Sequence, residues 1–172
     1  MEEKNFKELL KGVKAMAFDV DGVLTDSSLL LMPNGELVRV MNMRDSIAMK
    51  LAVKNGYKLC IITGGNSKEV KQRLNRLGIS DIYLKTENKL EAMKEFVELY
   101  DLEMSEVLYM GDDLVDYEVM THVGVPVCPK DAVQEIKRIA KYISNIEGGK
   151  GCVRDVIEQV MKVSGKWVIP KF

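Results

Sequence analysis

The sequence of 172 residues contains few cysteines, one histidine and no long hydrophobic run. Its three cysteines, Cys60, Cys128 and Cys152, are odd in number and not closely paired, which argues against a disulfide framework and favours a reducing cytoplasm. No segment approaches the roughly 20 apolar residues of a membrane span, and Met1–Lys11 lacks the apolar core of a signal peptide. With a formal net charge of -1, the chain also lacks the basic surface that is typical of nucleic-acid-binding proteins.

Two further absences exclude common types of functional site. His122 is the only histidine and has no cysteine or histidine partner at ligand spacing, so a histidine-based zinc site is not expected. The segment Gly148-Gly149-Lys150-Gly151 lacks the spacing of a Walker A nucleotide-binding loop. The chemistry must therefore come from other residues.

Short apolar runs alternate with amphipathic helical patterns along the chain. Strands are predicted at Ala15–Phe18, Lys58–Ile62, Ile82–Leu84, Val107–Met110, Val125–Val127 and, more weakly, Tyr142–Ile143. Helices are predicted at Asp45–Asn55, Ser67–Leu77, Asn88–Tyr100, Asp116–His122, Ala132–Ala140 and Val153–Val163. This alternation predicts a single α/β domain over residues 1–172, with a doubly wound, mainly parallel sheet covered by helices on both faces.

One insertion after the first core strand breaks this alternation. Residues 28–41 are predicted to form a β-hairpin, with strands Leu29–Met32 and Glu36–Met41 around the turn Pro33-Asn34-Gly35. Both faces of this hairpin are apolar, and an isolated two-stranded ribbon is marginally stable in water. We therefore expect the hairpin to pack against hairpins of other copies of the chain. The apolar tail, residues 165–172, is too short to form a core of its own.

Two carboxylates directly follow the first predicted strand. Asp19 and Asp21 come after Ala15–Phe18, and Gly22 allows the chain to turn there. Open α/β sheets bind ligands at the carboxyl ends of their strands. At such a place one carboxylate can attack phosphorus beside a magnesium ion while the second transfers protons. A polar turn after a strand is the simpler explanation of this segment when it is taken alone.

Further polar groups follow the other predicted strands, as the segments Thr63-Gly64-Gly65, Lys89 and Gly111-Asp112-Asp113-Leu114-Val115-Asp116. Each alone has an ordinary explanation as a turn, a solvated lysine or a helix cap, and Asp113 could be only a cap. In a parallel sheet, however, all of them converge on one edge. Thr63 and Lys89 suit a phosphate, while Asp19, the Asp21 carbonyl and Asp112 suit Mg²⁺.

In order and spacing these segments resemble the four motifs of the haloacid dehalogenase (HAD) superfamily of phosphatases, whose fold is a Rossmann-like sheet. Over roughly residues 12–163 the chain also resembles a narrower group, the 3-deoxy-D-manno-octulosonate 8-phosphate (KDO 8-phosphate) phosphatases. The narrower resemblance rests on Asp19–Asp26, Asn34-Gly35-Glu36, Arg44-Asp45, Ile61-Ile62-Thr63-Gly64, Asn88-Lys89-Leu90, Tyr109–Leu114 and Gly148–Gly151.

The resemblance implies a role for each of these residues. Asp19 would be the nucleophile that forms an aspartyl-phosphate, and Asp21 the general acid and base. The phosphate and substrate contacts would be Thr63, Gly64, Lys89 and Lys150. The Mg²⁺ ligands would be Asp19, Asp21 and Asp112, with Asp113 as a further candidate. The substrate would be a sugar-acid phosphate, KDO 8-phosphate first, in lipopolysaccharide biosynthesis.

The resemblance also implies a homotetramer, assembled through the hairpins, in which neighbouring chains help to cover the site. The spacing of the motifs is consistent with this arrangement. Asp19 and Thr63 enclose only the hairpin and one helix, and Thr63 and Lys89 enclose only a helix and a strand, so no cap domain fits. Water would reach the site of an uncapped monomer, and closure is expected from neighbouring subunits or from the tail.

Two departures and two rival interpretations remain. Gly65 stands where the family usually has arginine, and Ser46 where it usually has glycine, which leaves a related nine-carbon acid-sugar phosphate open as the substrate. A receiver-like signalling domain would also combine acids, a threonine and a lysine on a doubly wound sheet. An inactive phosphatase-like binding module is the other alternative.

Overall fold

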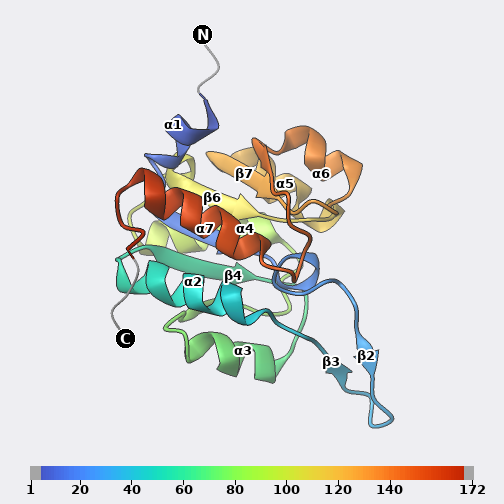
Figure 1. Cartoon of the computed structure of the whole chain (residues 1–172). Coiled ribbons are helices and arrows are strands. Elements are labelled where there is room, and N and C mark those ends of the chain that lie inside the picture. The colour runs from blue at the N-terminus through green and yellow to red at the C-terminus, as the bar shows by residue number, and fades with distance from the viewer. Residues whose placement is uncertain (1–4, 169–172) are drawn as a thin grey trace.

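The computed structural model describes residues 5–168, and its centre is a six-stranded sheet in the order β5-β4-β1-β6-β7-β8 (Figure 1). The strands are β1 (Ala15–Phe18), β4 (Lys58–Ile62), β5 (Asp81–Tyr83), β6 (Val107–Met110), β7 (Val125–Cys128) and β8 (Tyr142–Ile143). All neighbouring strands of this sheet are parallel. The predicted doubly wound parallel sheet is therefore confirmed.

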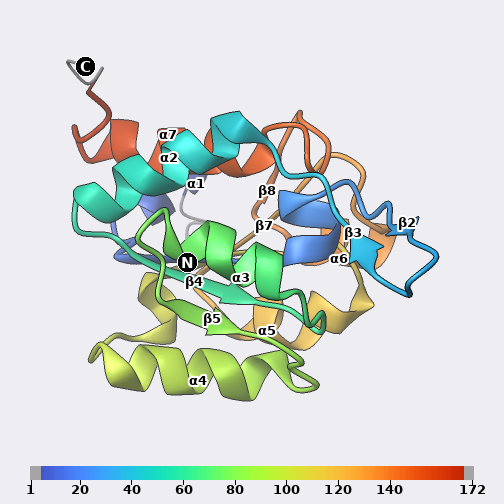
Figure 2. The same ribbon diagram turned by 90° about the horizontal axis from the view of Figure 1, so that it is seen from below.

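Helices cover both faces of the sheet (Figure 2). They are α1 (Phe6–Leu10), α2 (Met43–Lys54), α3 (Lys68–Asn75), α4 (Lys89–Leu99), α5 (Tyr117–His122), α6 (Gln134–Ile139) and α7 (Cys152–Val163). Buried residues of α1, α2, α3 and α7 share one hydrophobic cluster, and those of α4, α5 and α6 share the other. The sheet thus separates two cores.

The central strand β1 illustrates why these short runs form strands. Met16 and Phe18 enter one cluster, Ala15 and Ala17 enter the other, and all four side chains are fully buried. A strand that is buried on both faces needs apolar residues at every position rather than alternate ones. Cys60 of β4, which pairs with Ala17, is buried in the second cluster as a small core residue.

Several element boundaries differ slightly from the predicted ones, and side-chain caps set the starts of α2, α3 and α4. Asn42 accepts a hydrogen bond from the Arg44 amide at 2.8 Å, so α2 begins at Met43 rather than at Asp45. The strand predicted at Ile82–Leu84 lies one residue earlier. Helix α1 was not predicted, because its five residues are too few to display a helical period.

The predicted hairpin is present, but its strands are shorter than expected. Only β2 (Leu30–Leu31) and β3 (Leu37–Val38) pair, in antiparallel register, and the ribbon extends away from the domain (Figure 1). No third strand extends the pairing within the described chain, so the ladder stops early. Its exposed apolar side chains are Leu29, Leu30, Leu31, Met32, Leu37, Val38 and Val40.

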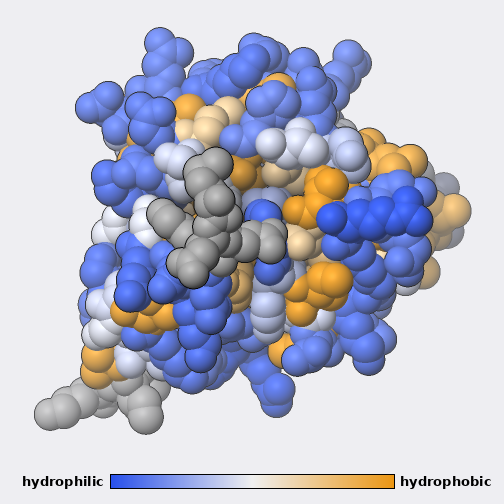
Figure 3. Space-filling view, turned by 90° about the horizontal axis from the view of Figure 1, so that it is seen from above, coloured by the Kyte–Doolittle hydropathy of each residue, from blue (hydrophilic) through white to orange (hydrophobic). Residues whose placement is uncertain are grey.

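The C-terminal tail is described only as far as Val168, so its last residues lie outside the described part. Trp167 is partly buried against the core, with the Arg154 guanidinium 5.5 Å from its ring centroid. The face seen from above is largely hydrophilic, with hydrophobic residues in separate groups (Figure 3). Within residues 5–168 no helix is long and apolar enough to cross a membrane.

Candidate active site

The candidate site lies where the strand order of the sheet reverses. On one side of β1 the sheet continues with β4 and then β5, and on the other side with β6, β7 and β8. Asp19 follows β1 and Asp112 follows β6, so both lie at this switch point, where open α/β sheets bind ligands. Carboxylate oxygens of Asp19, Asp112 and Asp116 lie within 4.8 Å of one another.

The loop after β1 is built so that Asp19 and Asp112 can approach each other. The Asp19 carboxylate accepts a hydrogen bond from the Val20 amide at 2.6 Å. Gly22 then turns the chain at φ +88°, a conformation that favours glycine. A Cβ at Gly22 would lie only 1.9 Å from Asp112 Oδ2, so any side chain there would displace the carboxylate.

Lys89 is the cation of this cluster. It begins α4, where Asn88 caps the helix by accepting a hydrogen bond from the Glu91 amide, as the sequence spacing predicts. Lys89 Nζ lies 2.7 Å from both Asp19 Oδ2 and Asp116 Oδ1, and only 5% of the residue is exposed. Burial lowers the pKa of Lys89, but the two carboxylates outweigh it and raise the pKa, so the ammonium stays charged.

Asp116 is a site residue that the sequence analysis left out of its assignments, although it lies in the recognised motif. Its carboxylate is fully buried and accepts hydrogen bonds from Lys89, from the Tyr109 hydroxyl at 2.8 Å and from the Asp112 amide at 3.0 Å. A Cβ at Gly111 would lie 2.4 Å from the Asp116 Cβ, so glycine permits this approach. The spacing of four from Asp112, together with a lysine that needs counter-charges, was the available signal.

The charges of the cluster do not balance without a further cation. Asp19, Asp112 and Asp116 against Lys89 give a formal charge of −3 + 1 = −2. Burial and the neighbouring Asp116 raise the pKa of Asp19 to about 7 and that of Asp112 to about 8. Asp112 Oδ1 is buried without a hydrogen-bond partner in the described chain. An all-oxygen donor set with this charge fits a hard divalent cation such as Mg²⁺.

Thr63 and Gly64 lie beside this cluster, on the loop that follows β4, the neighbour of β1. Thr63 is 3% exposed, and its Oγ1 accepts a hydrogen bond from the Gly65 amide at 3.0 Å. Gly64 is exposed at the edge of a pocket. This loop thus places one buried hydroxyl near the sheet edge.

Asp21 stands apart from the acidic cluster. Both of its carboxylate oxygens are held by Arg39, with Nε 2.7 Å from Oδ1 and Nη2 3.0 Å from Oδ2. Its carboxylate is therefore not one of the three that lie together, and the metal ligand expected from this residue is its main-chain carbonyl. Bidentate pairs of this kind have fixed geometry.

Two further assigned residues lie at the periphery. Asp113 is exposed, and its side chain caps the turn Leu114–Asp116 by accepting a hydrogen bond from the Leu114 amide at 2.7 Å. Its carboxylate does not join the acidic cluster. Lys150 is exposed and pairs with Asp26 at 3.2 Å. The glycines before Lys150 pack against the loop after β1, since a Cβ at Gly148 would lie 2.0 Å from the Gly22 carbonyl oxygen.

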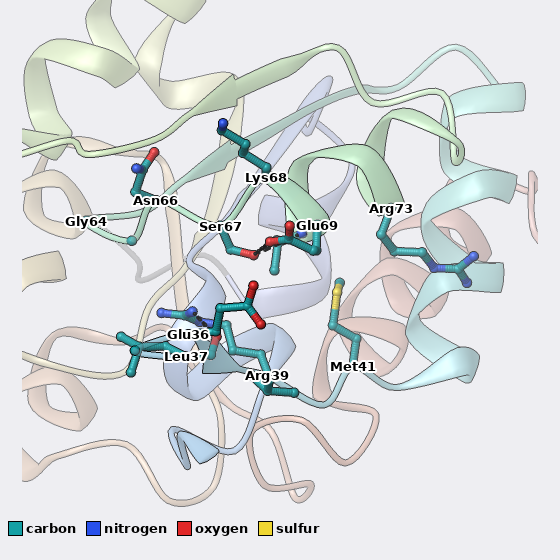
Figure 4. Close-up of a pocket in the computed structure, with 14 residues that line it drawn as sticks. Glu36, Leu37, Arg39, Met41, Gly64, Asn66, Ser67, Lys68, Glu69 and Arg73 are labelled. Atoms are coloured by element: carbon teal, nitrogen blue, oxygen red, sulfur yellow. Dashed lines mark hydrogen bonds between the residues drawn. The ribbon is translucent and has the colours of Figure 1, made fainter. Parts of the chain in front are cut away.

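A pocket of about 830 Å³ adjoins the loop after β4. In Figure 4, hairpin residues Glu36, Leu37 and Arg39 line one side and residues at the start of α3 line the other, with Arg73 farther along. The size is in the usual range for small-molecule sites.

Comparisons with known proteins agree with this geometry. Residues 77–154 match the family model for haloacid dehalogenase-like hydrolases. The 3-deoxy-D-manno-octulosonate 8-phosphate phosphatase of Escherichia coli is 35% identical over 156 residues, which cover 91% of this chain and 83% of that protein. The chain belongs to this phosphatase family. It is therefore a phosphatase with the HAD-like fold.

Solved structures of similar proteins share the whole architecture. The phosphatase of this name from Yersinia pestis has a TM-score of 0.92 at 31% identity and covers 95% of this chain and 88% of its own. The enzyme from Moraxella catarrhalis, solved in complex with magnesium ion, phosphate ion and KDO, has a TM-score of 0.89 at 30% identity. That comparison covers 92% of this chain and 91% of the other.

The strand order also decides against the receiver-like alternative. Numbered along the chain, the six core strands lie in the order 3-2-1-4-5-6, whereas the flavodoxin-like arrangement of receiver domains is 2-1-3-4-5. The acids of this chain therefore follow the first and fourth core strands.

Asp116 and Asp113 provide a matched pair of acids for a first test. Asp116→Asn removes the charge that holds Lys89, and we expect kcat/KM for a phosphate ester to fall by about 10- to 100-fold. Asp113→Asn alters only an exposed cap and is expected to change kcat/KM less than about threefold. Steady-state kinetics of both variants, with circular dichroism to verify folding, make the comparison. Equal losses in the two variants would contradict the role given to Asp116.

Metal-free protein is predicted to lose stability as pH rises from 5 to 8. Asp19 and Asp112 have pKa values of about 7 and about 8 in the folded chain against an ordinary value of 3.8, so the folded state binds more protons than the unfolded state in this range. Stability therefore falls with pH there. The carboxylates with lowered pKa values, such as Glu106, titrate below the ordinary value of 4.5 when folded and so add little to the slope above pH 5.

Melting temperatures in EDTA at several pH values measure this slope. Excess Mg²⁺ should flatten the slope, because a cation at the cluster favours the ionised acids, and Asp112→Asn should make it shallower without metal. A melting temperature in EDTA that stays constant or rises between pH 5 and 8 would refute the assignment.

Proposed function

We propose that the protein hydrolyses the phosphate monoester of an acid sugar, with KDO 8-phosphate as the leading substrate and KDO and phosphate as products. The observation that carries this proposal is the set Asp19, Lys89, Asp112 and Asp116 at the switch point of the sheet, in which Asp112 is half-buried and the other three are buried. The family membership supports the phosphatase chemistry, and the Moraxella complex with KDO supports the class of sugar.

In the first step Asp19 is the nucleophile. One of its carboxylate oxygens attacks phosphorus, an aspartyl-phosphate bond forms, and the bond from phosphorus to the sugar oxygen breaks. Asp21 gives a proton to that leaving oxygen. Lys89 and Thr63 hold the phosphoryl oxygens, which offsets the repulsion between the phosphate and the carboxylates.

In the second step the aspartyl-phosphate is hydrolysed. Asp21, now ionised, takes a proton from a water molecule, whose oxygen attacks phosphorus. The bond between phosphorus and the Asp19 oxygen breaks, which releases inorganic phosphate and restores the carboxylate. The proton that Asp21 gave up in the first step is thereby recovered.

Mg²⁺ is the proposed cofactor of both steps. Asp19 and Asp112 would hold it through carboxylate oxygens, and Asp21 through its main-chain carbonyl. The ion would supply the positive charge that the cluster lacks and would hold the transferring phosphate. Activity is accordingly expected to require Mg²⁺ and to be lost in EDTA.

The two departures from the family pattern have different structural consequences. Ser46 is buried in α2 and donates a hydrogen bond to the Asn42 carbonyl at 3.3 Å, so it has no place in the substrate pocket. Gly65 lines that pocket, next to Arg39. A related nine-carbon acid-sugar phosphate therefore remains the second candidate, and a panel of sugar phosphates with purified protein distinguishes the two.

We further propose that the chain works as a cytoplasmic homotetramer assembled through the hairpins, in which neighbouring subunits help to close the site. The exposed apolar residues of β2 and β3 support the assembly, because monomeric proteins rarely leave such surfaces uncovered. Free Cys60, Cys128 and Cys152, all buried, support a reducing compartment.

The nucleophile assignment predicts that Asp19→Asn abolishes turnover and leaves the fold intact. An amide cannot form the aspartyl-phosphate, so kcat should fall by at least about 1,000-fold. Phosphate release from KDO 8-phosphate measures the loss, and mass spectrometry excludes deamidation of the new asparagine. Wild-type protein without phosphatase turnover would instead favour the inactive binding module.

The assembly proposal predicts a molar mass about four times the 19.4 kDa of one chain. Charges placed on the hairpin, as in the double variant Leu37→Glu with Val40→Glu, should dissociate it, because a buried charge opposes association. Light scattering on both proteins tests this, with Lys50→Glu on the outer face of α2 as a charge control. A wild-type monomer with full turnover of sugar phosphate would overturn the claim.

A further inference from the structure

The ion pair between Arg39 and Asp21 poses a problem for the proposed chemistry. Arg39 donates to both carboxylate oxygens of Asp21, at 2.7 Å and 3.0 Å, and its side chain is only 8% exposed. An Asp21 carboxylate with both oxygens engaged cannot reach the leaving oxygen of a substrate. Asp21 must therefore exchange at least one of these contacts before it transfers a proton.

The Arg39 side chain is held between the hairpin and the loop after β4. Its Nη1 donates to the Leu37 carbonyl at 3.2 Å. Its Nη2 lies 3.3 Å from the place that a Cβ at Gly65 would occupy, and Thr63 Oγ1 lies at the same distance from that place. Because Gly65 has no side chain, the guanidinium can lie this close to the Thr63 loop.

Arg39 also lines the open pocket between the hairpin and α3 (Figure 4). The pocket carries two more cations, Lys68 and Arg73, and two acids, Glu36 and Glu69. Arg39 differs from the other two cations because it contacts the proposed general acid directly. A sugar whose phosphate lies near Asp19 would extend past Asp21 toward this pocket.

We propose that Arg39 determines substrate specificity by exchanging partners. The carboxylate of an acid-sugar phosphate replaces Asp21 on its guanidinium, and the released Asp21 carboxylate takes up a proton from the solvent, which it then gives to the leaving oxygen. The proposal rests on the proposed function. A planar guanidinium binds any carboxylate in the same bidentate geometry, so one carboxylate can replace another without loss of charge-assisted hydrogen bonds. A substrate without a carboxylate offers no replacement, and Asp21 then stays paired.

The test compares two substrates on wild-type protein and Arg39→Met. KDO 8-phosphate carries a carboxylate, and mannose 6-phosphate does not. For KDO 8-phosphate we expect kcat/KM to fall by about 100-fold in the variant, the size of loss seen when a paired charge is removed. For mannose 6-phosphate we expect kcat/KM to stay unchanged or to rise, since Asp21 is free from the start.

Two further variants complete the experiment. Arg73→Met removes an arginine from the same pocket that is not bonded to Asp21, and it should preserve the ratio of the two kcat/KM values within about threefold. Arg39→Lys keeps the charge but not the bidentate geometry, and it should restore only part of the preference. If Arg39→Met does not fold, the ratio of the two kcat/KM values is compared between Arg39→Lys and the wild-type protein instead.

The possible results separate this inference from the function on which it rests. Suppose that the wild-type protein prefers KDO 8-phosphate and that Arg39→Met lowers kcat/KM equally for both substrates or for neither. That result overturns the exchange and leaves the proposed function intact. Equal reduction would mean that Arg39 only positions Asp21. A wild-type protein with no preference for the carboxylate-bearing substrate overturns both. Loss of the preference in Arg39→Met, but not in Arg73→Met, supports the exchange.

Discussion

The contact on which the rest of the site depends is the buried ammonium of Lys89 between Asp19 and Asp116. Holding three carboxylates together without it, two of them buried, would be prohibitively costly, and burying a lysine without acids would be costly as well. Lys89 compensates one negative charge and leaves a deficit that a divalent cation can fill. With all three acids ionised, the charges of the site therefore approach balance only when a divalent cation joins the acids and the lysine, which is also the set of charges that phosphoryl transfer requires.

The fold brings this set together from distant parts of the sequence. Asp19 and Asp112 are far apart in the chain but follow neighbouring strands, and Lys89 reaches them from the start of a capped helix. The two glycines of the site, Gly22 and Gly111, are required by distance, since a Cβ at either would collide with a carboxylate of the cluster. The same residues that end strands and start helices therefore form the site.

Much of this arrangement could be predicted from the sequence, because apolar runs buried on both faces and caps such as Asn88 are local signals. The convergence of four side chains on one edge of the sheet could also be predicted, because parallel strands have their carboxyl ends at the same edge. These side chains are Asp19, Thr63, Lys89 and Asp112. The role of Asp116 was signalled only by its spacing from Asp112 and by a lysine that needs counter-charges, and the pairing of Asp21 with Arg39 had no signal at all. Both depend on side-chain contacts across long loops, for which the sequence has no periodic signal.

The hairpin links two properties that are separate in most enzymes. Its apolar strands are too short to be stable alone, so in the proposed assembly neighbouring hairpins fix its position. Arg39 directly follows β3 and reaches Asp21 from there, so the position of the hairpin sets the position of the guanidinium. A change that loosened the assembly would move Arg39 away from Asp21 and the pocket, although neither Asp19 nor the metal ligands would move. Under the proposed assembly, subunit association would therefore contribute to the choice of substrate, while the acidic cluster at the sheet edge would carry the bond cleavage.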